Sequence, residues 1–200
     1  MTNILISVPS GDMLHADFSM SLLNLTLYSF QNKIHVGVSN PRFSLVQIGR
    51  CEAVKSALSM NIEYLMFLDS DMVFPSDTLV RLASHGLPVV CCDASTRREP
   101  FQNVLMKTDG AKIDHSKNNP NLIEVMGASA ACMLIRKDVL EKIKEPYFHV
   151  TFNHKNEYLG EDYYFSNKVR QAGYSIYCDT KLSKQIGHIG NKTYYVNQGE

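Results

Sequence analysis

The chain has 200 residues, of which 44% are hydrophobic, and its 20 basic residues balance 20 acidic ones to a formal net charge of +0. This length and apolar content suit one domain with a substantial core, so we predict a single domain over residues 1–200. Because no global charge attracts a polyanion, we expect neither nucleic acid nor an anionic membrane as a partner. Any anion site must be local.

The sequence contains no apolar run long enough to span a bilayer, and its first residues lack the basic start of a signal peptide. We therefore expect a soluble, cytoplasmic protein. Five cysteines form an odd set without metal-site spacing, and Cys91 and Cys92 adjoin within an apolar run. This pattern favours reduced, buried thiols over a disulfide framework.

Strands and helices alternate through the first half of the chain. Helical periodicity predicts helices at residues 17–28, 45–60 and 77–84, and short apolar runs predict strands at 4–8, 34–38, 64–68 and 87–92. Such alternation is typical of the α/β class, with a parallel sheet flanked by helices.

The pattern changes beyond Asp93. Short segments around Val104, Ile113 and Ile123 are separated by polar turns, which predicts a small antiparallel addition to the sheet. Two further helices and two further strands follow. We place the helices at 137–144 and 160–172 and the strands at 132–135 and 174–178. The tail from residue 181 shows no clear periodicity, and we expect it to fold back over the rest or to fray.

The most informative segment is residues 64–71, where five apolar or aromatic residues precede Asp69, Ser70 and Asp71. An apolar run without alternation fits a strand covered on both faces, and ligands bind at the carboxyl ends of such strands. Two carboxylates at that edge can hold a hard divalent cation, which can bind a diphosphate. Alternatively, Asp69 or Asp71 caps the next helix or lies in a solvated turn before Pro75.

Motifs across most of the chain resemble, in their order and spacing, the GT-A glycosyltransferases, which carry a D-x-D after a buried strand. The chain resembles the small members of this family, including those encoded by phages, large DNA viruses or bacteria. The motifs are Val8-Pro9, Arg50, FLDSDMVFP, STRREP, MGASAACMLIRKDVL, LGEDYYFSNKVRQAGY and IGHIG. The resemblance implies a GT-A, Rossmann-like fold: a mixed, mainly parallel sheet flanked by helices. It also implies a nucleotide-binding half at 1–93 and an acceptor and catalytic half at 94–200.

The resemblance implies an activity as well: transfer of a sugar from a metal-bound nucleoside-diphosphate sugar to a hydroxyl acceptor on a glycan. UDP is the nucleotide we expect. In the family the D-x-D carboxylates bind Mn²⁺ or Mg²⁺ bridging the donor diphosphate, so Asp69 and Asp71 become metal-ligand candidates, with Asp71 the stronger. Asp69 and Ser70 are also expected to contact the nucleotide. A cation there would offset the negative charge that develops on the leaving diphosphate.

His188 lies between two Ile-Gly pairs and resembles the late histidine that completes the metal or diphosphate site in this family. Imidazole is a suitable ligand for Mn²⁺ and also hydrogen-bonds phosphate. The alternative for a histidine among glycines is an ordinary turn residue.

Glu161 and Asp162 follow Gly160 at the start of a predicted helix. The family's E-D motif supplies a general base that removes the proton from the acceptor hydroxyl. We expect this role for Asp162, with Glu161 as the alternative, and either carboxylate can instead bind an acceptor hydroxyl. A purely structural explanation also stands, because carboxylates stabilise helix N-termini.

The remaining donor-site candidates follow from the same resemblance. Arg50 is expected to reach the nucleotide, while Arg97 and Arg98 are expected to contact phosphate or acceptor. For these arginines the alternative is a solvated surface position. The nucleobase and ribose are expected against the residues that end the first strand, Pro9, Ser10 and Gly11, for which the alternative is an ordinary turn.

Two other functions compete with glycosyl transfer. A sugar-1-phosphate nucleotidyltransferase has a related sheet, but its first loop should be Gly-rich and basic, whereas residues 9–18 contain no Lys or Arg. A non-catalytic carbohydrate- or nucleotide-binding module is the second competitor. The donor sugar and the stereochemical course stay open.

Overall fold

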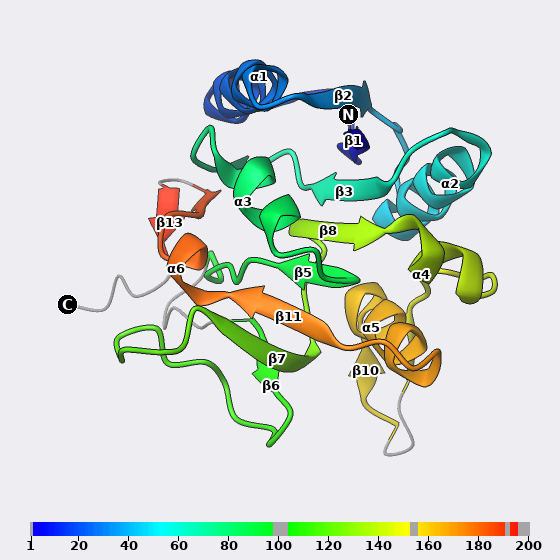
Figure 1. Ribbon diagram of the computed structural model, residues 1–200. Coiled ribbons are helices and arrows are strands. Elements are labelled where there is room, and N and C mark those ends of the chain that lie inside the picture. The colour runs from blue at the N-terminus through cyan, green and yellow to red at the C-terminus, as the bar shows by residue number, and fades with distance from the viewer. Residues whose placement is uncertain (1, 98–103, 153–155, 191–192, 196–200) are drawn as a thin grey trace.

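The computed structural model describes residues 2–97, 104–152, 156–190 and 193–195. Its centre is an eight-stranded sheet in the order β2-β1-β3-β8-β5-β11-β7-β6 (Figure 1). The strands are β1 (Thr2–Ser7), β2 (Ile34–Ser39), β3 (Tyr64–Leu68), β5 (Val89–Cys91), β6 (Met106–Lys107), β7 (Leu122–Gly127), β8 (Cys132–Arg136) and β11 (Ile176–Asp179).

Most strands of this sheet run in one direction. β1 is parallel to β2 and β3, and β5 is parallel to β11. β8 is antiparallel to both β3 and β5, and β7 is antiparallel to β11 and β6. The predicted mixed, mainly parallel sheet is confirmed, and so is the antiparallel addition at its far edge. The sequence did not indicate that an antiparallel strand, β8, would lie in the middle.

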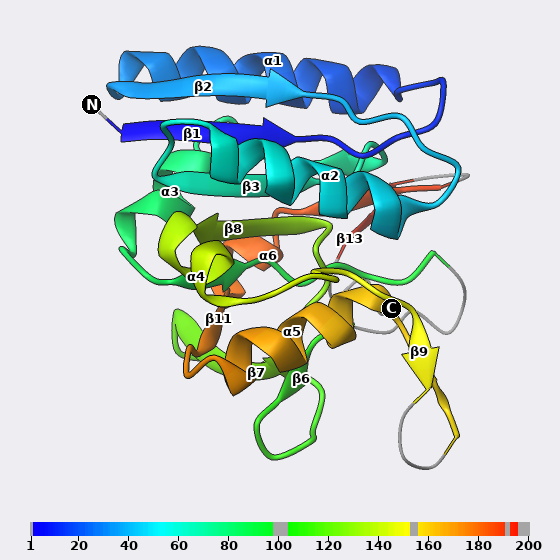
Figure 2. The same ribbon diagram turned by 90° about the vertical axis from the view of Figure 1, so that its right-hand side faces the viewer.

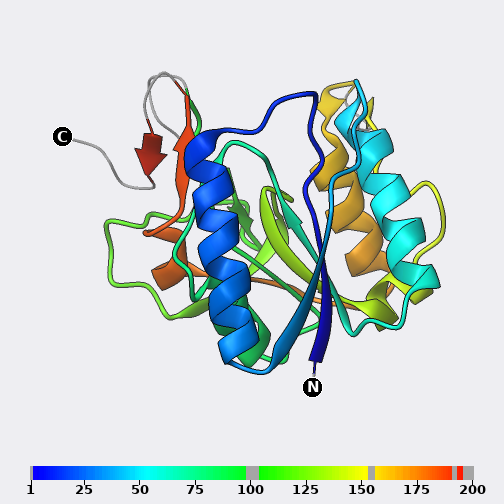
Figure 3. The same ribbon diagram turned by 90° about the horizontal axis from the view of Figure 1, so that it is seen from above.

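Helices cover both faces of the sheet (Figures 2 and 3). One face packs against α2 (Val46–Ser59), α4 (Lys137–Lys142) and α5 (Glu161–Gln171), and the other against α1 (Ala16–Gln31), α3 (Thr78–Ser84) and α6 (Thr180–Ser183). Each face of the sheet has its own hydrophobic core, and the side chains of β3 alternate between the two. Leu65 and Phe67 lie in one core, and Met66 and Leu68 lie in the other. This double burial is the physical reason for the unbroken apolar run before the D-x-D.

Two small antiparallel sheets complete the fold. β9 (Thr151–Phe152) and β10 (Tyr158–Leu159) form one, and β4 (Met72–Val73), β12 (Gly187–Ile189) and β13 (Thr193–Tyr195) form the other. The tail, which showed no periodicity, thus contributes α6 and two strands. Strands of two or three residues are too short to produce a recognisable alternation, so only their long-range pairing reveals them.

The predicted elements of the first half agree with the structure to within a few residues, and the strand at 64–68 coincides with β3. The cysteines are free, as predicted, and four of them are buried whereas Cys51 is half-buried. Within the described ranges, no helix combines the length and the apolar character needed to cross a bilayer.

Candidate functional site

The D-x-D lies in a tight turn at the carboxyl end of β3. The N–H of Met72 donates to the carbonyl of Asp69 at 3.2 Å, and the chain continues into β4. β4 pairs with β12 so that His188 lies opposite Met72, and the N–H of Ile189 donates to the carbonyl of Asp71 at 2.7 Å. Backbone pairing therefore brings His188, far away in sequence, to the second aspartate of the motif.

The His188 ring is fixed by two contacts. Its Nδ1 lies 2.9 Å from the carbonyl oxygen of Ser95, and its Nε2 lies 3.3 Å from Asp71 Oδ2. Since a carbonyl only accepts, Nδ1 must carry the proton, and Nε2 faces the carboxylate. Burial lowers the pKa of His188, but the hydrogen bonds to Asp71 and Ser95 outweigh burial, so this pKa is raised.

Asp71 also contacts Arg97, whose Nη1 lies 2.8 Å from Asp71 Oδ2 and whose side chain is 50% exposed. Burial raises the pKa of Asp71, whereas the His188 hydrogen bond and the positive charge of Arg97 lower it, and the net result is a lowered pKa. Asp71 is accordingly an ionised carboxylate at neutral pH, as a metal ligand must be.

Arg50 is the centre of a second cluster. It reaches from α2 into the interior, where only 2% of its side chain is exposed, and lies over the Phe148 ring at 5.7 Å. Its Nη2 is 2.8 Å from Asp69 Oδ1, its Nη1 is 2.8 Å from Glu161 Oε1, and Nη1 also donates to Asp162 Oδ1. One buried cation thus joins the D-x-D to the start of α5. Three carboxylates around one guanidinium leave an excess of negative charge.

The Asp162 carboxyl group is strongly affected by its burial in the cluster. Burial raises its pKa to about 6, the charge of Arg50 opposes this rise, and the carboxylates of Glu161 and Asp69 add to it. The Ser129 hydroxyl donates to Asp162 Oδ2 at 3.3 Å. Both base candidates therefore lie beside Asp69, and Asp162 combines a hydroxyl contact with a pKa close to neutrality.

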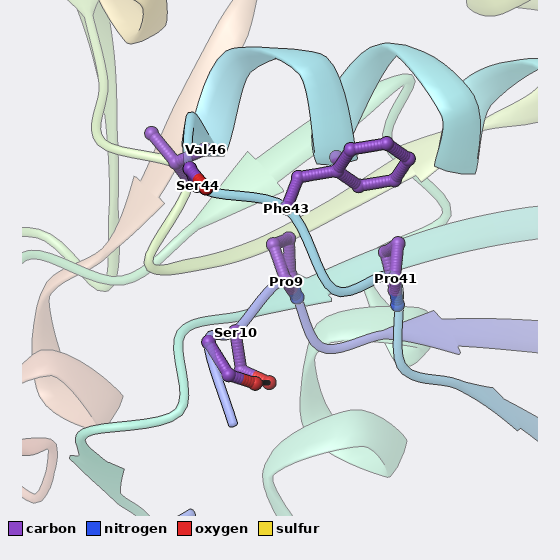
Figure 4. Close-up of a pocket in the computed structure, with 8 residues that line it drawn as sticks. Pro9, Ser10, Pro41, Phe43, Ser44 and Val46 are labelled. Atoms are coloured by element: carbon purple, nitrogen blue, oxygen red, sulfur yellow. Dashed lines mark hydrogen bonds between the residues drawn. The ribbon is translucent and has the colours of Figure 1, made fainter. Parts of the chain in front are cut away.

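A cavity of about 220 Å³ opens at the carboxyl ends of β1 and β2 (Figure 4). The side chain of Asn40 fixes the end of β1 beside this cavity, since it donates to the Val8 carbonyl at 2.7 Å and to Ser10 Oγ at 2.8 Å. The predicted Pro9, Ser10 and Gly11 all line it. The complete lining is Pro9, Ser10, Gly11, Pro41, Phe43, Ser44, Val46 and Gly49.

The structure brings together only part of the predicted metal-ligand set. Asp71 and His188 converge, whereas Asp69 turns to Arg50, and the described residues contain no group of three or more His, Cys, Asp or Glu side chains arranged around a metal. The chemistry of the converging pair still fits Mn²⁺: an ionised carboxylate oxygen stands beside an imidazole Nε2 whose other nitrogen is held by a backbone carbonyl.

Other predicted residues occupy different surroundings. Ser70 is half-buried in the turn between Asp69 and Asp71, and Arg98 lies outside the described residues. Arg50 was expected to reach the nucleotide, but its guanidinium is enclosed by carboxylates. Sequence reasoning missed Ser95, which acts through its backbone carbonyl, and the Ser129 hydroxyl. Ser129 stands in a run of small residues, Ala128 to Ala131, and this run is the signal in the sequence that a substrate could approach the backbone there.

Comparisons with known proteins agree with this architecture. No protein-family model and no curated protein sequence matches the chain. Among solved structures, A197 from STIV matches with a TM-score of 0.60 and 22% identity, over 100% of this chain and 96% of that one. The catalytic domain of Drosophila beta1,4-galactosyltransferase 7 in complex with xylobiose matches with a TM-score of 0.56 and 12% identity, over 100% and 77% of the two chains. The chain has a GT-A-like glycosyltransferase fold.

A second structure of the Drosophila enzyme, a mutant in complex with manganese, UDP-Gal and xylobiose, matches with a TM-score of 0.51 and 13% identity. It covers 100% of this chain and 72% of the Drosophila chain. At identities of 22% or less, the TM-scores and the coverage of these matches show a shared fold and nothing further. The manganese and the sugars belong to the Drosophila enzyme.

Proposed function

We propose that this protein is a metal-dependent glycosyltransferase that moves a sugar from a nucleoside-diphosphate sugar, UDP-sugar in the first instance, to a hydroxyl of a glycan acceptor. The observation that carries the proposal is the Asp71–His188 pair beside the Arg50 carboxylate cluster, at the carboxyl ends of the strands. Ligands of open α/β sheets bind at this edge. A protein of the same fold in complex with manganese and UDP-Gal supports the choice of donor.

Asp71 and His188 would hold Mn²⁺ or Mg²⁺. The Ser95 carbonyl keeps His188 Nδ1 protonated, so Nε2, which lies 3.3 Å from Asp71 Oδ2, is the nitrogen that would give up this contact and turn its lone pair to the cation. When bound, the cation supplies Lewis-acid stabilisation of the charge on the departing diphosphate. Arg97 is half-exposed and already pairs with Asp71, so its fork can shift to a phosphate oxygen when a donor enters.

The cavity lined by Pro9, Ser10 and Gly11 would receive the nucleobase and ribose. A small cavity with exposed backbone groups and a hydroxyl suits a flat, polar ring. Asp69 and Ser70 directly precede Asp71 in the turn after β3 and would contact the ribose. Arg50 acts indirectly: it holds Asp69 against the start of α5.

Asp162 would act as the general base. Its carboxylate takes the proton of the acceptor hydroxyl as that oxygen forms a bond to C1 of the sugar, while the C1–oxygen bond to the diphosphate breaks and its electron pair leaves with the diphosphate. This direct displacement inverts the anomeric centre. A carboxyl pKa of about 6 suits a base working near neutral pH. Glu161, on the same guanidinium, is the alternative base.

A panel of nucleotide sugars, each with and without Mn²⁺, tests the donor assignment through protection against thermal unfolding. A ligand that binds only the folded state raises the apparent melting temperature. We expect a UDP-sugar to do so only with Mn²⁺, and the same mixture to release UDP slowly by hydrolysis. Binding without hydrolysis or transfer would indicate a binding module. Pyrophosphate release from a nucleoside triphosphate and a sugar 1-phosphate would indicate a nucleotidyltransferase.

A further inference from the structure

Asp93 is a fully buried carboxylate that belongs to neither the Asp71–His188 pair nor the Arg50 cluster. It follows β5, which runs in the same direction as β3 because β8 is antiparallel to both. Asp93 therefore lies at the edge of the sheet that carries the D-x-D. Removing a carboxylate from water is costly unless hydrogen bonds replace the water, so its partners show what it does.

Three backbone N–H groups and one imidazole replace water around Asp93. Its Oδ1 accepts from the N–H of Ala94 at 2.9 Å, and from those of Val104 and Leu105 at 3.1 Å each. Its Oδ2 lies 2.9 Å from Nε2 of His115, which is also fully buried. We call these five residues the Asp93 hub. One carboxylate oxygen thus binds the backbone at two places, directly after residue 93 and again at residues 104 and 105.

The contact that fixes the His188 ring is attached to Asp93 from two sides. Ser95, whose carbonyl lies 2.9 Å from His188 Nδ1, stands two positions after Asp93. Ser183 Oγ accepts a hydrogen bond from the backbone N–H of Asp93 at 2.9 Å, and Ser183 ends α6, which leads to β12 and His188. Because each peptide unit is planar and spans only about 3.8 Å, the position of Asp93 restricts where the Ser95 carbonyl can lie.

The same segment brings a second group to the proposed metal site. Arg97, four positions after Asp93, has its Nη1 2.8 Å from Asp71 Oδ2. At the other end of the hub, the Tyr163 hydroxyl donates to the Val104 carbonyl at 2.7 Å. Tyr163 belongs to α5, the helix that begins with the two base candidates. The Asp93 hub is therefore connected to both parts of the candidate site.

We propose that Asp93 is a positioning residue of the metal site: its carboxylate holds the Ser95 carbonyl where that carbonyl keeps His188 Nδ1 protonated. This leaves His188 Nε2 as the ligand nitrogen. The inference rests on the proposed function in one respect, that Asp71 and His188 hold a divalent cation. Asp93 acts through Ser95 and does not touch the cation. Loss of the partner that orients a ligating histidine weakens metal binding, which gives the inference a measurable consequence.

Nitrogen-15 NMR of labelled histidine reports the His188 tautomer and needs no metal. At alkaline pH, where the ring is neutral, the native chain should carry the proton on Nδ1, and a His188→Gln variant identifies the His188 signals. In Asp93→Ala the proton should move toward Nε2, the form that a free neutral imidazole prefers in water. Asp93→Asn keeps an oxygen for the three backbone N–H groups, and its amide can donate to His115, so it should restore protonation of Nδ1.

Mn²⁺ affinity is the second readout, measured from the electron paramagnetic resonance signal of the free ion. Asp93→Ala should bind Mn²⁺ at least about tenfold more weakly than the native chain, whereas Asp93→Asn should bind it with near-native affinity. Leu140→Ala is the control for lost stability, since Leu140 is fully buried on α4. α4 follows the antiparallel strand β8 and so lies at the opposite edge of the sheet. This variant should unfold at lower urea and keep both the tautomer and the Mn²⁺ affinity.

If Asp93→Ala does not fold, Asp93→Ser, which retains one acceptor, takes its place with the same expected results. An Asp93→Ala variant that keeps either the Nδ1-protonated ring or the native Mn²⁺ affinity would overturn the proposal. It would also be overturned if Asp93→Asn restored neither property, or if Leu140→Ala lost them to the same extent. A native chain that binds no Mn²⁺ would contradict the proposed function instead, and the tautomer alone would then decide the role of Asp93.

Discussion

Arg50 Nη2 lies 2.8 Å from Asp69 Oδ1, and this ion pair connects helix α2 to the end of β3. Because the same guanidinium holds Glu161 and Asp162, the first aspartate of the D-x-D and both base candidates share one buried cation. The cluster therefore links the proposed donor site to the proposed base. It also makes Arg50 a stability determinant.

Replacing Arg50 by Met should lower the free energy of unfolding at pH 7 by about 3 kcal/mol, because removal of one partner leaves partly buried carboxylates without their counter-charge. Urea denaturation measures this loss. Arg97→Met is the control: its side chain is 50% exposed, so the loss should stay below about 1 kcal/mol. Equal losses in the two variants would show that the Arg50 cluster is not strongly coupled to folding.

Asp162→Asn should change how stability depends on pH. Burial raises the pKa of Asp162 from its ordinary value of 3.8 to about 6. Between these values the folded state holds a proton that the unfolded state has lost, so this group's contribution to the free energy of unfolding falls as pH rises through this window. The full effect is about 3 kcal/mol, since each pKa unit is worth about 1.4 kcal/mol.

The stability of Asp162→Asn relative to the native chain should therefore increase between pH 4 and pH 6.5 in parallel urea titrations. Asp138→Asn serves as the control, because hydrogen bonds from Arg136 lower the pKa of Asp138 instead of raising it. A relative stability of Asp162→Asn that does not change across this range would contradict the raised pKa.

The same carboxyl group should control the rate. If Asp162 is the base, turnover at saturating donor should decline tenfold for each pH unit below about 6, because only the ionised form accepts a proton. Asp162→Asn should lose most turnover while keeping donor affinity. Glu161→Gln should show the same decline of turnover at low pH as the native chain. The opposite pattern, with activity lost in Glu161→Gln and kept in Asp162→Asn, would assign the base to Glu161.

Gly49→Ala should separate stability from nucleotide binding. A methyl group on Gly49 would lie 3.5 Å from Phe43 and 3.6 Å from Pro9, which is ordinary contact, within the lining of the cavity. In the interior of α2, Ala is favoured over Gly by about 1 kcal/mol, so the melting temperature should rise. Nucleotide affinity should fall because the cavity shrinks.

Gly86→Ala is the matched control for that substitution. It has open space around it but a φ of +63°, so Ala there is strained and should lower stability without affecting the nucleotide. Nucleotide affinity that is unchanged in Gly49→Ala would remove the cavity from the donor site.

The elements that the sequence predicted well are those that carry a local signal. The run of residues 64–68 predicts β3 because its side chains are buried on both faces, and the helical spacing of residues 45–60 predicts α2. The location of Asp69 and Asp71 at a strand end follows from the same run. The cavity at Pro9, Ser10 and Gly11 follows from the end of β1.

The features that could not be predicted depend on long-range pairing. The family resemblance led us to expect His188 at the metal site, but no local signal did: β12 has three residues, and only its pairing with β4 brings His188 to Asp71. His188 Nδ1 is held by the backbone carbonyl of Ser95. Every residue has such a carbonyl, so the type of residue at position 95 does not reveal this contact. The burial of Arg50 was equally hidden, because an arginine in a helix is solvated by default and becomes a core residue only when carboxylates from two other elements surround it.

Calorimetric titration of UDP into the protein with Mn²⁺ tests the central claim most directly. The native chain and the Asp109→Ala control should bind UDP in a Mn²⁺-dependent manner, since Asp109 is an exposed aspartate that pairs with Lys107. Asp71→Ala, checked for native circular dichroism, should lose that binding, whereas Asp162→Ala should retain it and lose turnover. Unchanged Mn²⁺-dependent affinity in Asp71→Ala would contradict the account.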